Sequence, residues 1–167
     1  YNDVSFTLEY GQHCAFIGSN GTGKTTPIEI MLNPDKFMYD GKITKDEGWR
    51  VGYVNQFDKS DKERKLTVFE YLSEDFVNNQ AMQDEVCAQM ADAEDIEPLL
   101  ERYQELLDRF AAMDGDNYES NIRRQLKLAE LEDKAELALE NLSGGELKLV
   151  QVIRQMLRRP GLLIMDE

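Results

Sequence analysis

The sequence predicts an α/β fold that is interrupted by a helical subdomain, and three observations support this prediction. Short apolar runs bounded by turn residues lie near both ends of the chain, and such runs are typical of strands. A glycine-rich loop joins one of these runs to an apolar helical segment. The long middle of the chain carries apolar side chains at helical spacing instead. The expected strands lie at 4–8, 13–17, 42–45, 50–54 and 162–165.

The chain is expected to form two parts. Residues 1–57 and 139–167 would form an α/β core, incomplete at both ends because the chain opens in a strand and stops directly after one. Residues 58–138 would form the helical subdomain. No apolar run is long enough to cross a bilayer, and no signal peptide is recognised. Cys14 and Cys87 lack metal-ligand spacing, which favours reduced thiols and a cytoplasmic location.

A phosphate-binding loop is predicted at residues 18–26, which read GSNGTGKTT and fit the pattern G-x-x-x-x-G-K-[ST]. The glycines allow tight turns that direct backbone N–H groups at phosphates. Lys24 would reach the outer phosphates, the Thr25 hydroxyl would ligate Mg²⁺, and the following helix would add its dipole. Pro27 falls in the first turn of that helix, where it is tolerated. The candidate binding residues are Gly18, Ser19, Asn20, Gly21, Thr22, Gly23, Lys24, Thr25 and Thr26.

Four helices are expected in the middle of the chain. The first covers 67–76, where a Thr-x-x-Glu capping box opens it, and the second covers 82–90. The longest stripe of apolar side chains, at spacings of three and four residues, predicts a helix over 95–113. A further helix would begin after Asn117 as its N-cap. The last two helices are predicted to form an antiparallel hairpin.

Charge in this helical region is one-sided. Between residues 81 and 121 the sequence has twelve acidic residues, against Arg102 and Arg109 as the basic ones. This pattern fits either a solvated helical face or an acidic contact surface. The net charge of −14 argues against indiscriminate binding to nucleic-acid phosphates, which depends on lysine and arginine. Docking on a ribonucleoprotein through a local patch stays open.

A second motif, LSGGE at residues 142–146, opens a predicted helix that continues to residue 157. Its Ser-x-x-Glu spacing is also that of an ordinary capping box, so the motif alone does not establish a binding site. A helix N-terminus is nevertheless suited to receive a phosphate. The motif residues after the leucine are Ser143, Gly144, Gly145 and Glu146.

Three further polar residues stand at the ends of predicted strands. Gln56 closes the strand at 50–54, and Asp166 and Glu167 follow the apolar strand at 162–165. Open α/β sheets place their ligands at the carboxyl ends of their strands. Taken alone, Gln56 is best explained as an ordinary strand-end amide, whereas Asp166 and Glu167 could equally be a solvated strand end. Their order along the chain is what makes them candidates.

The P-loop, the strand-end glutamine, LSGGE and LLIMDE, in this order, resemble the ATP-binding cassette (ABC) ATPases over essentially the whole chain. The resemblance implies an α/β P-loop NTPase (RecA-like) core with a small antiparallel β part and an inserted α-helical subdomain. It implies ATP and Mg²⁺ as cofactors, with Asp166 and Gln56 as further metal contacts and Gln56 also contacting ATP. Glu167 would be the catalytic base. LSGGE would be the signature, which contacts ATP bound to a second cassette, although Glu146 replaces the commoner glutamine.

The long hairpin, which reads LLERYQELLDRF, resembles the ABC-F branch of this family. That resemblance implies two cassettes in one chain, an ATPase acting on the ribosome and, in several members, antibiotic resistance. The present chain would be part of the first cassette and weakly active alone. A transporter's nucleotide-binding subunit, held by a membrane partner, is an alternative reading, and a non-hydrolysing regulatory ATP-binding module is another.

Overall fold

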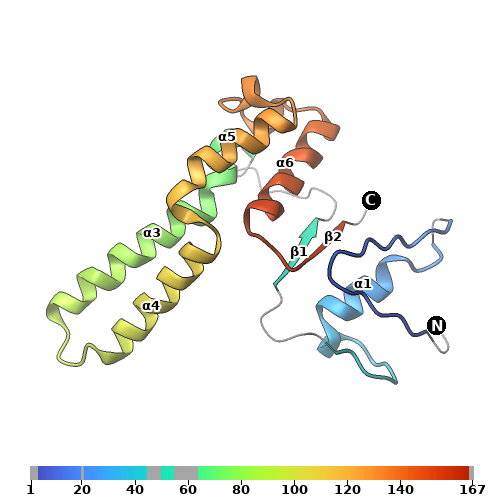
Figure 1. The fold of residues 1–167 in the computed structure, drawn as a ribbon, viewed down its shortest axis with the longest axis horizontal. Coiled ribbons are helices and arrows are strands. Elements are labelled where there is room, and N and C mark those ends of the chain that lie inside the picture. Colours follow the sequence, from blue (N-terminus) through green and yellow to red (C-terminus); the bar gives the residue numbers. More distant parts are fainter. Residues whose placement is uncertain (1–3, 20, 45–49, 55–63, 166–167) are drawn as a thin grey trace. The chain divides into compact units, whose positions relative to one another are not determined.

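The computed structural model divides into two compact units, Tyr1–Lys45 and Asp46–Glu167, and each is described by itself (Figure 1). The first unit contains the glycine-rich loop. The second contains a small parallel sheet and the long helices. The residues that the structure describes are 4–19, 21–44, 50–54 and 64–165.

In the first unit, helix α1 (Thr25–Leu32) follows the glycine-rich loop directly. Pro27 lies in its first turn, where backbone N–H groups lack intrahelical partners, and the helix continues through it as predicted. Ile28 is the buried residue of this helix. The short 3₁₀ helix η1 (Pro34–Lys36) comes next, so the proline after α1 marks the change of direction.

The strands predicted at 4–8, 13–17 and 42–45 are not found among the described residues of the first unit. The prediction of a buried strand at 13–17 is wrong, since the side chain of Ile17 is 94% exposed. Phe6 and Phe16 do meet edge to face, with ring centroids 5.6 Å apart. An apolar run shows which side chains could be buried, but a strand also needs a hydrogen-bonded neighbour.

The second unit contains a parallel pair of strands. β1 (Val51–Val54) pairs with β2 (Leu162–Met165), with Val51 opposite Leu162 and Val54 opposite Met165. The strands predicted at 50–54 and 162–165 are therefore confirmed. The expected antiparallel β part is not confirmed, because the sheet found among the described residues is parallel.

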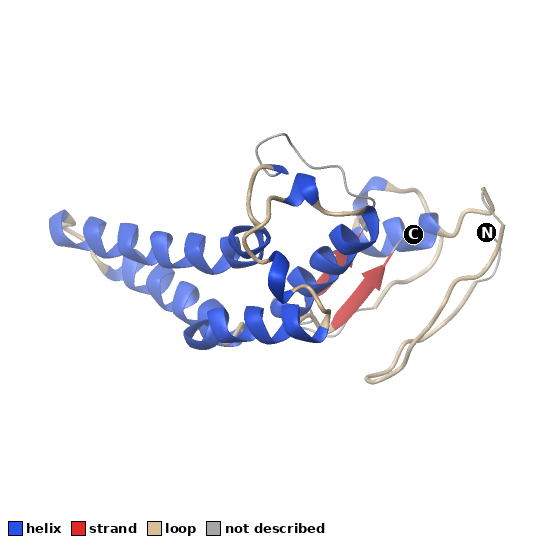
Figure 2. Cartoon of the chain, turned by 90° about the horizontal axis from the view of Figure 1, so that it is seen from above, coloured by secondary structure: helices blue, strands red, loops and turns tan. Residues whose placement is uncertain are grey.

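Helices α3 (Val68–Asp92) and α4 (Glu97–Ala112) form a long hairpin (Figures 1 and 2). The sequence predicted two helices where the 25-residue α3 is continuous, and it paired α4 with the wrong helix. Asn79, 3% exposed, explains the difference: its Nδ2 donates to the carbonyl of Leu106, 3.3 Å away on α4. A polar segment that looked like a break is thus the place where the two helices are tied together.

The remaining helices cover the first half of α3 with an apolar core. After η2 (Gly115–Asn117) come α5 (Tyr118–Leu128), η3 (Glu132–Lys134), η4 (Leu139–Asn141) and α6 (Gly144–Leu157). The rings of Phe76 and Tyr118 stack with centroids 5.1 Å apart. None of the helices that the structure describes is long and apolar enough to cross a membrane. The most deeply buried members of this core are Val68, Leu72, Phe76, Ile122, Leu126, Leu139 and Val150.

Candidate nucleotide-binding site

The glycine-rich loop turns on two glycines with positive φ. Gly21 has a φ of 83° and Gly23 a φ of 87°, a region that residues with a Cβ rarely adopt. Between them Thr22 folds back, and its backbone N–H and Oγ1 donate to the carbonyl of Ser19 at 3.4 and 2.8 Å. The loop therefore has the tight curvature that a phosphate cradle requires.

Lys24 places a positive charge over this loop. Its Nζ donates to the carbonyl oxygens of Gly18 at 3.0 Å and Ser19 at 3.1 Å. A Cβ at Gly18 would lie 2.8 Å from Oγ1 of Thr22, so a larger residue would push into the loop. An ammonium group and a tightly turned backbone are thus gathered in one place, and both are features that bind phosphate.

The N-terminus of α1 stands directly behind the loop. Thr25 and Thr26 are its first two residues, and the backbone N–H of Thr26 donates to the carbonyl of Gly23 at 3.0 Å. The positive end of the helix dipole therefore faces the loop. These groups fit a triphosphate with Mg²⁺: Lys24 would contact the phosphates, and the Thr25 hydroxyl would contact the metal.

Four of the predicted site residues lie outside the described residues: Asn20, Gln56, Asp166 and Glu167. Their roles therefore stay predictions. Within the part of the chain that the structure describes, no group of three or more His, Cys, Asp or Glu side chains could hold a metal. Of the three residues predicted to contact the metal, Thr25 is the one that the structure describes.

The LSGGE motif forms the N-terminus of α6, as predicted. Ser143 is the N-cap, and its Oγ accepts from the backbone N–H of Glu146 at 3.4 Å. In return, Oε2 of Glu146 accepts from the backbone N–H of Ser143 at 2.8 Å. Gly144 and Gly145 are exposed, and their backbone N–H groups have no hydrogen-bond partner among the described residues. Two donors at the positive end of a helix therefore face solvent.

An ion pair that the sequence does not predict adjoins this motif. Nζ of Lys134, the last residue of η3, pairs with Oε1 of Glu146. The Lys134 ammonium, together with the hydrogen bonds to Ser143, lowers the pKa of Glu146 to about 2. The same contact raises the pKa of Lys134. Both groups are therefore charged throughout the neutral range. The spacing of twelve residues has no periodicity that would have indicated the pair.

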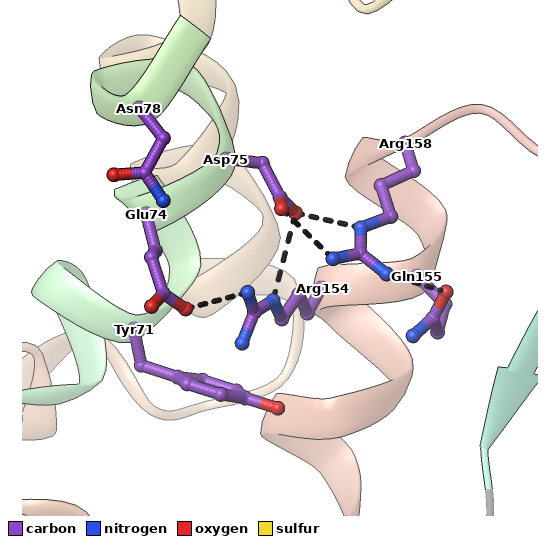
Figure 3. A pocket seen from close by; sticks show the side chains of 7 residues that line it. All are labelled: Tyr71, Glu74, Asp75, Asn78, Arg154, Gln155 and Arg158. Atoms are coloured by element: carbon purple, nitrogen blue, oxygen red, sulfur yellow. Dashed lines mark hydrogen bonds and ion pairs between the residues drawn. The ribbon is translucent and has the colours of Figure 1, made fainter. Parts of the chain in front are cut away.

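A second cluster of charges joins α6 to α3 (Figure 3). Nε and Nη2 of Arg158 donate to the two carboxylate oxygens of Asp75 at 2.6 and 2.9 Å. Nη2 of Arg154 donates to Glu74 at 2.6 Å, and its guanidinium lies 4.3 Å from the ring centroid of Tyr71. These side chains line an open cavity of about 350 Å³.

The electrostatics of this cluster favour charged groups on both helices. Burial alone would raise the pKa of Asp75, but the hydrogen bonds and charge of Arg158 outweigh this effect and hold the pKa below its usual value. Arg154 is 8% exposed, and its pKa is raised, because contacts with Tyr71 and the carboxylates outweigh the cost of burial. The cluster therefore fixes α6, which begins at LSGGE, against α3.

The loop with its lysine and the exposed N-terminus of α6 are typical of an ATP-binding domain. A family model described as "ABC transporter" matches residues 1–167, so the chain belongs to this family. This result confirms the resemblance to ABC ATPases.

The curated relatives include a protein named for translation and proteins named as transporter ATP-binding proteins. The energy-dependent translational throttle protein EttA of Haemophilus influenzae is 32% identical over 99% of this chain and 30% of its own length. The uncharacterized ABC transporter ATP-binding protein YfmM of Bacillus subtilis is 32% identical over 100% of this chain and 33% of its own length. The zinc import ATP-binding protein ZnuC of Hydrogenovibrio crunogenus is 28% identical over 99% of this chain and 53% of its own length. The chain thus spans about a third of EttA and YfmM.

Proposed function

We propose that this chain is a cassette that binds Mg²⁺-ATP and, together with a second cassette, hydrolyses it to change conformation on the ribosome. The observation that carries the ATP part is the loop of residues 18–26, in which Lys24 lies over a backbone turned by Gly21 and Gly23. ATP supplies the phosphate anhydride bond that is cleaved. The chain supplies the cradle, the metal contact at Thr25 and the base at Glu167.

The residues divide this work between two sites. In the first site Lys24 would leave the loop carbonyls and bind the outer phosphates, while Thr25 and Asp166 orient the metal and Gln56 senses it. Glu167 would hold the attacking water and accept its proton. In the second site the exposed N–H groups of Gly144 and Gly145 would bind the terminal phosphate of ATP held by the other cassette.

Two observations support action on the ribosome. EttA, an ABC-F protein whose name describes it as a translational throttle, matches nearly the whole chain. The α3–α4 hairpin is also long, as in the branch that the sequence resembles. Because this hairpin contains most of the acidic residues between 81 and 121, its contact surface would suit a basic protein better than RNA.

A transporter subunit is the second candidate function, favoured by the similarity to ZnuC. Its partner would be a membrane protein rather than the ribosome. The two candidates share the ATP chemistry and differ in partner, so a partner assay separates them.

Co-sedimentation of the full-length protein with ribosomes tests the proposal. Glu167→Gln, which removes the base but keeps the site's shape, should increase ATP-dependent binding, because the ATP-bound state would persist. Lys24→Ala should abolish ATP-dependent binding. Two results would contradict the ribosomal role: recovery of the protein with membranes, or ribosome binding that changes neither with ATP nor with the two substitutions. In either case, the effect of Lys24→Ala on ATP binding would still test the ATP site.

A further inference from the structure

The second unit contains two capping boxes with the same internal hydrogen bonds and different charges around them. Glu70 in the box of α3 and Glu146 in the box of α6 each accept from the backbone N–H of their N-cap residue, both at 2.8 Å. Glu146 also pairs with Lys134. Glu70 has no cationic partner among the described residues. A capping box therefore does not itself require a lysine.

Lys134 is held in place by the backbone around it. It ends η3, and the residues that follow accept hydrogen bonds from the first N–H groups of α3. The carbonyls of Ala135 and Leu137 accept from the N–H groups of Phe69 and Val68, each at 2.9 Å. The segment that carries Lys134 is therefore hydrogen-bonded to α3, whereas its partner Glu146 belongs to α6. The position of the lysine is thus set independently of Glu146.

We infer that Lys134 is a positioning residue for ATP hydrolysis, which holds Glu146 and neutralises its carboxylate where LSGGE receives the phosphate of another cassette. This inference rests on the proposed function. An unpaired carboxylate in the first turn of α6 would repel an incoming phosphate, because two nearby negative charges weaken the binding of the phosphate. The pair with Lys134 removes that repulsion and leaves the N–H groups of Gly144 and Gly145 as donors to the anion.

Three features support this assignment over simple surface pairing. The side chains of Lys134 and Glu146 are only 28% and 26% exposed, so water screens their charges incompletely. Glu146 uses both of its oxygens, one for the N-cap and one for the lysine. The lysine accompanies the box whose first N–H groups face solvent, whereas the box of α3 has no lysine partner among the residues that the structure describes.

The test uses the full-length protein and measures two quantities, kcat for ATP hydrolysis and Kd for ADP. Lys134→Met should lower kcat about tenfold, the usual scale for one charge-assisted contact. ADP binding should stay within about twofold, because ADP lacks the phosphate that reaches the signature. Lys127→Met, a charge removal on the exposed surface of α5, is the matched control and should leave both quantities unchanged.

Two further variants separate positioning from folding. In Lys134→Met/Glu146→Gln no carboxylate is left unpaired, so kcat should recover most of the loss. Lys134→Arg retains the charge and should keep kcat within about threefold of the unsubstituted protein, even if the methionine variant folds poorly. A double variant no faster than Lys134→Met, or Lys134→Met and Lys127→Met with equal kcat, would overturn the inference. An unsubstituted protein that hydrolyses no ATP would overturn the proposed function and the inference with it.

Discussion

The N-termini of α3 and α6 have the same capping box and different surroundings. Thr67 and Ser143 each accept from the backbone N–H three residues later, and Glu70 and Glu146 each return a bond to the N-cap. The box of α3 is closed over by the chain itself, because carbonyls of a neighbouring segment accept from its first two N–H groups. The box of α6 leaves the equivalent groups exposed.

A local motif therefore does not decide between a structural cap and an anion site. Both sequences, TVFE and SGGE, satisfy the capping rule. What separates them is a contact with residues far away in sequence, at 135–137 for α3. Glycines at the first two positions of α6 also keep side chains away from its donors. The proposed role of the second box therefore depends on backbone N–H groups that the fold leaves exposed.

The largest expected effect comes from removing the core that both helices share. Phe76 is 2% exposed and stacked on Tyr118. Phe76→Ala should lower the free energy of unfolding by about 3–5 kcal/mol, because it leaves a cavity among α3, α5 and α6. Urea unfolding followed by circular dichroism measures this. The neighbouring Val77→Ala, at a 48% exposed position, should change stability by less than about 0.5 kcal/mol. Equal losses of stability in Phe76→Ala and Val77→Ala would contradict a common core beneath α3 and α6.

A smaller effect is expected from the ion pair that connects the two helices. Asp75→Asn should lower the free energy of unfolding by about 1–2 kcal/mol. This value is reduced for solvent screening, because the side chain of Arg158 is partly exposed. Asp84→Asn, at an exposed site on the same helix, is the control and should have almost no effect.

The pH dependence of this loss has a definite sign. The pKa of Asp75 is lowered in the folded state, so its stabilising contribution is present above the unfolded pKa of about 3.9 and is lost as the pH falls through the folded pKa. The stability difference between the unsubstituted protein and Asp75→Asn should therefore be constant from neutral pH down to about pH 5 and shrink below about pH 4. A difference that grows on acidification would contradict the pairing.

The smallest effect is expected from the two caps. Thr67→Ala and Ser143→Ala should each lower the free energy of unfolding by about 1 kcal/mol, since each loses one side-chain acceptor of a helix N–H. Thermal unfolding of the pair measures this. A large difference between the two losses of stability would show that the two capping boxes do not stabilise their helices equally. The comparison between them would then have no basis.

The sequence predicts the features that depend on neighbours along the chain. The loop at 18–26, the helix that passes through Pro27, both capping boxes and the apolar stripe of α4 are all local patterns. The strands at 50–54 and 162–165 were also predicted, but not that they pair with each other in parallel. Pairing depends on contacts between residues that are far apart in sequence.

The features that the sequence does not predict are non-local. Asn79 lies between the two helices that the sequence predicts at 67–76 and 82–90. In the structure it lies within the continuous helix α3, where its side chain donates to the carbonyl of Leu106 on α4. The segment at 13–17 had the apolar character of a buried strand but is exposed. Lys134 is one lysine among many in the sequence, and its proximity to Glu146 follows only from the fold.

The turnover of ATP by the two cap variants distinguishes a phosphate-binding helix N-terminus from a purely structural cap. In the full-length protein, Ser143→Ala should lower kcat at least about tenfold, because the signature would lose the hydroxyl and the geometry that are proposed to contact the phosphate of the other cassette. Thr67→Ala, with the same loss of a cap, should stay within about twofold of the unsubstituted kcat. Equal kcat values for the two variants would contradict the account, since the box of α6 would then be a structural cap like that of α3.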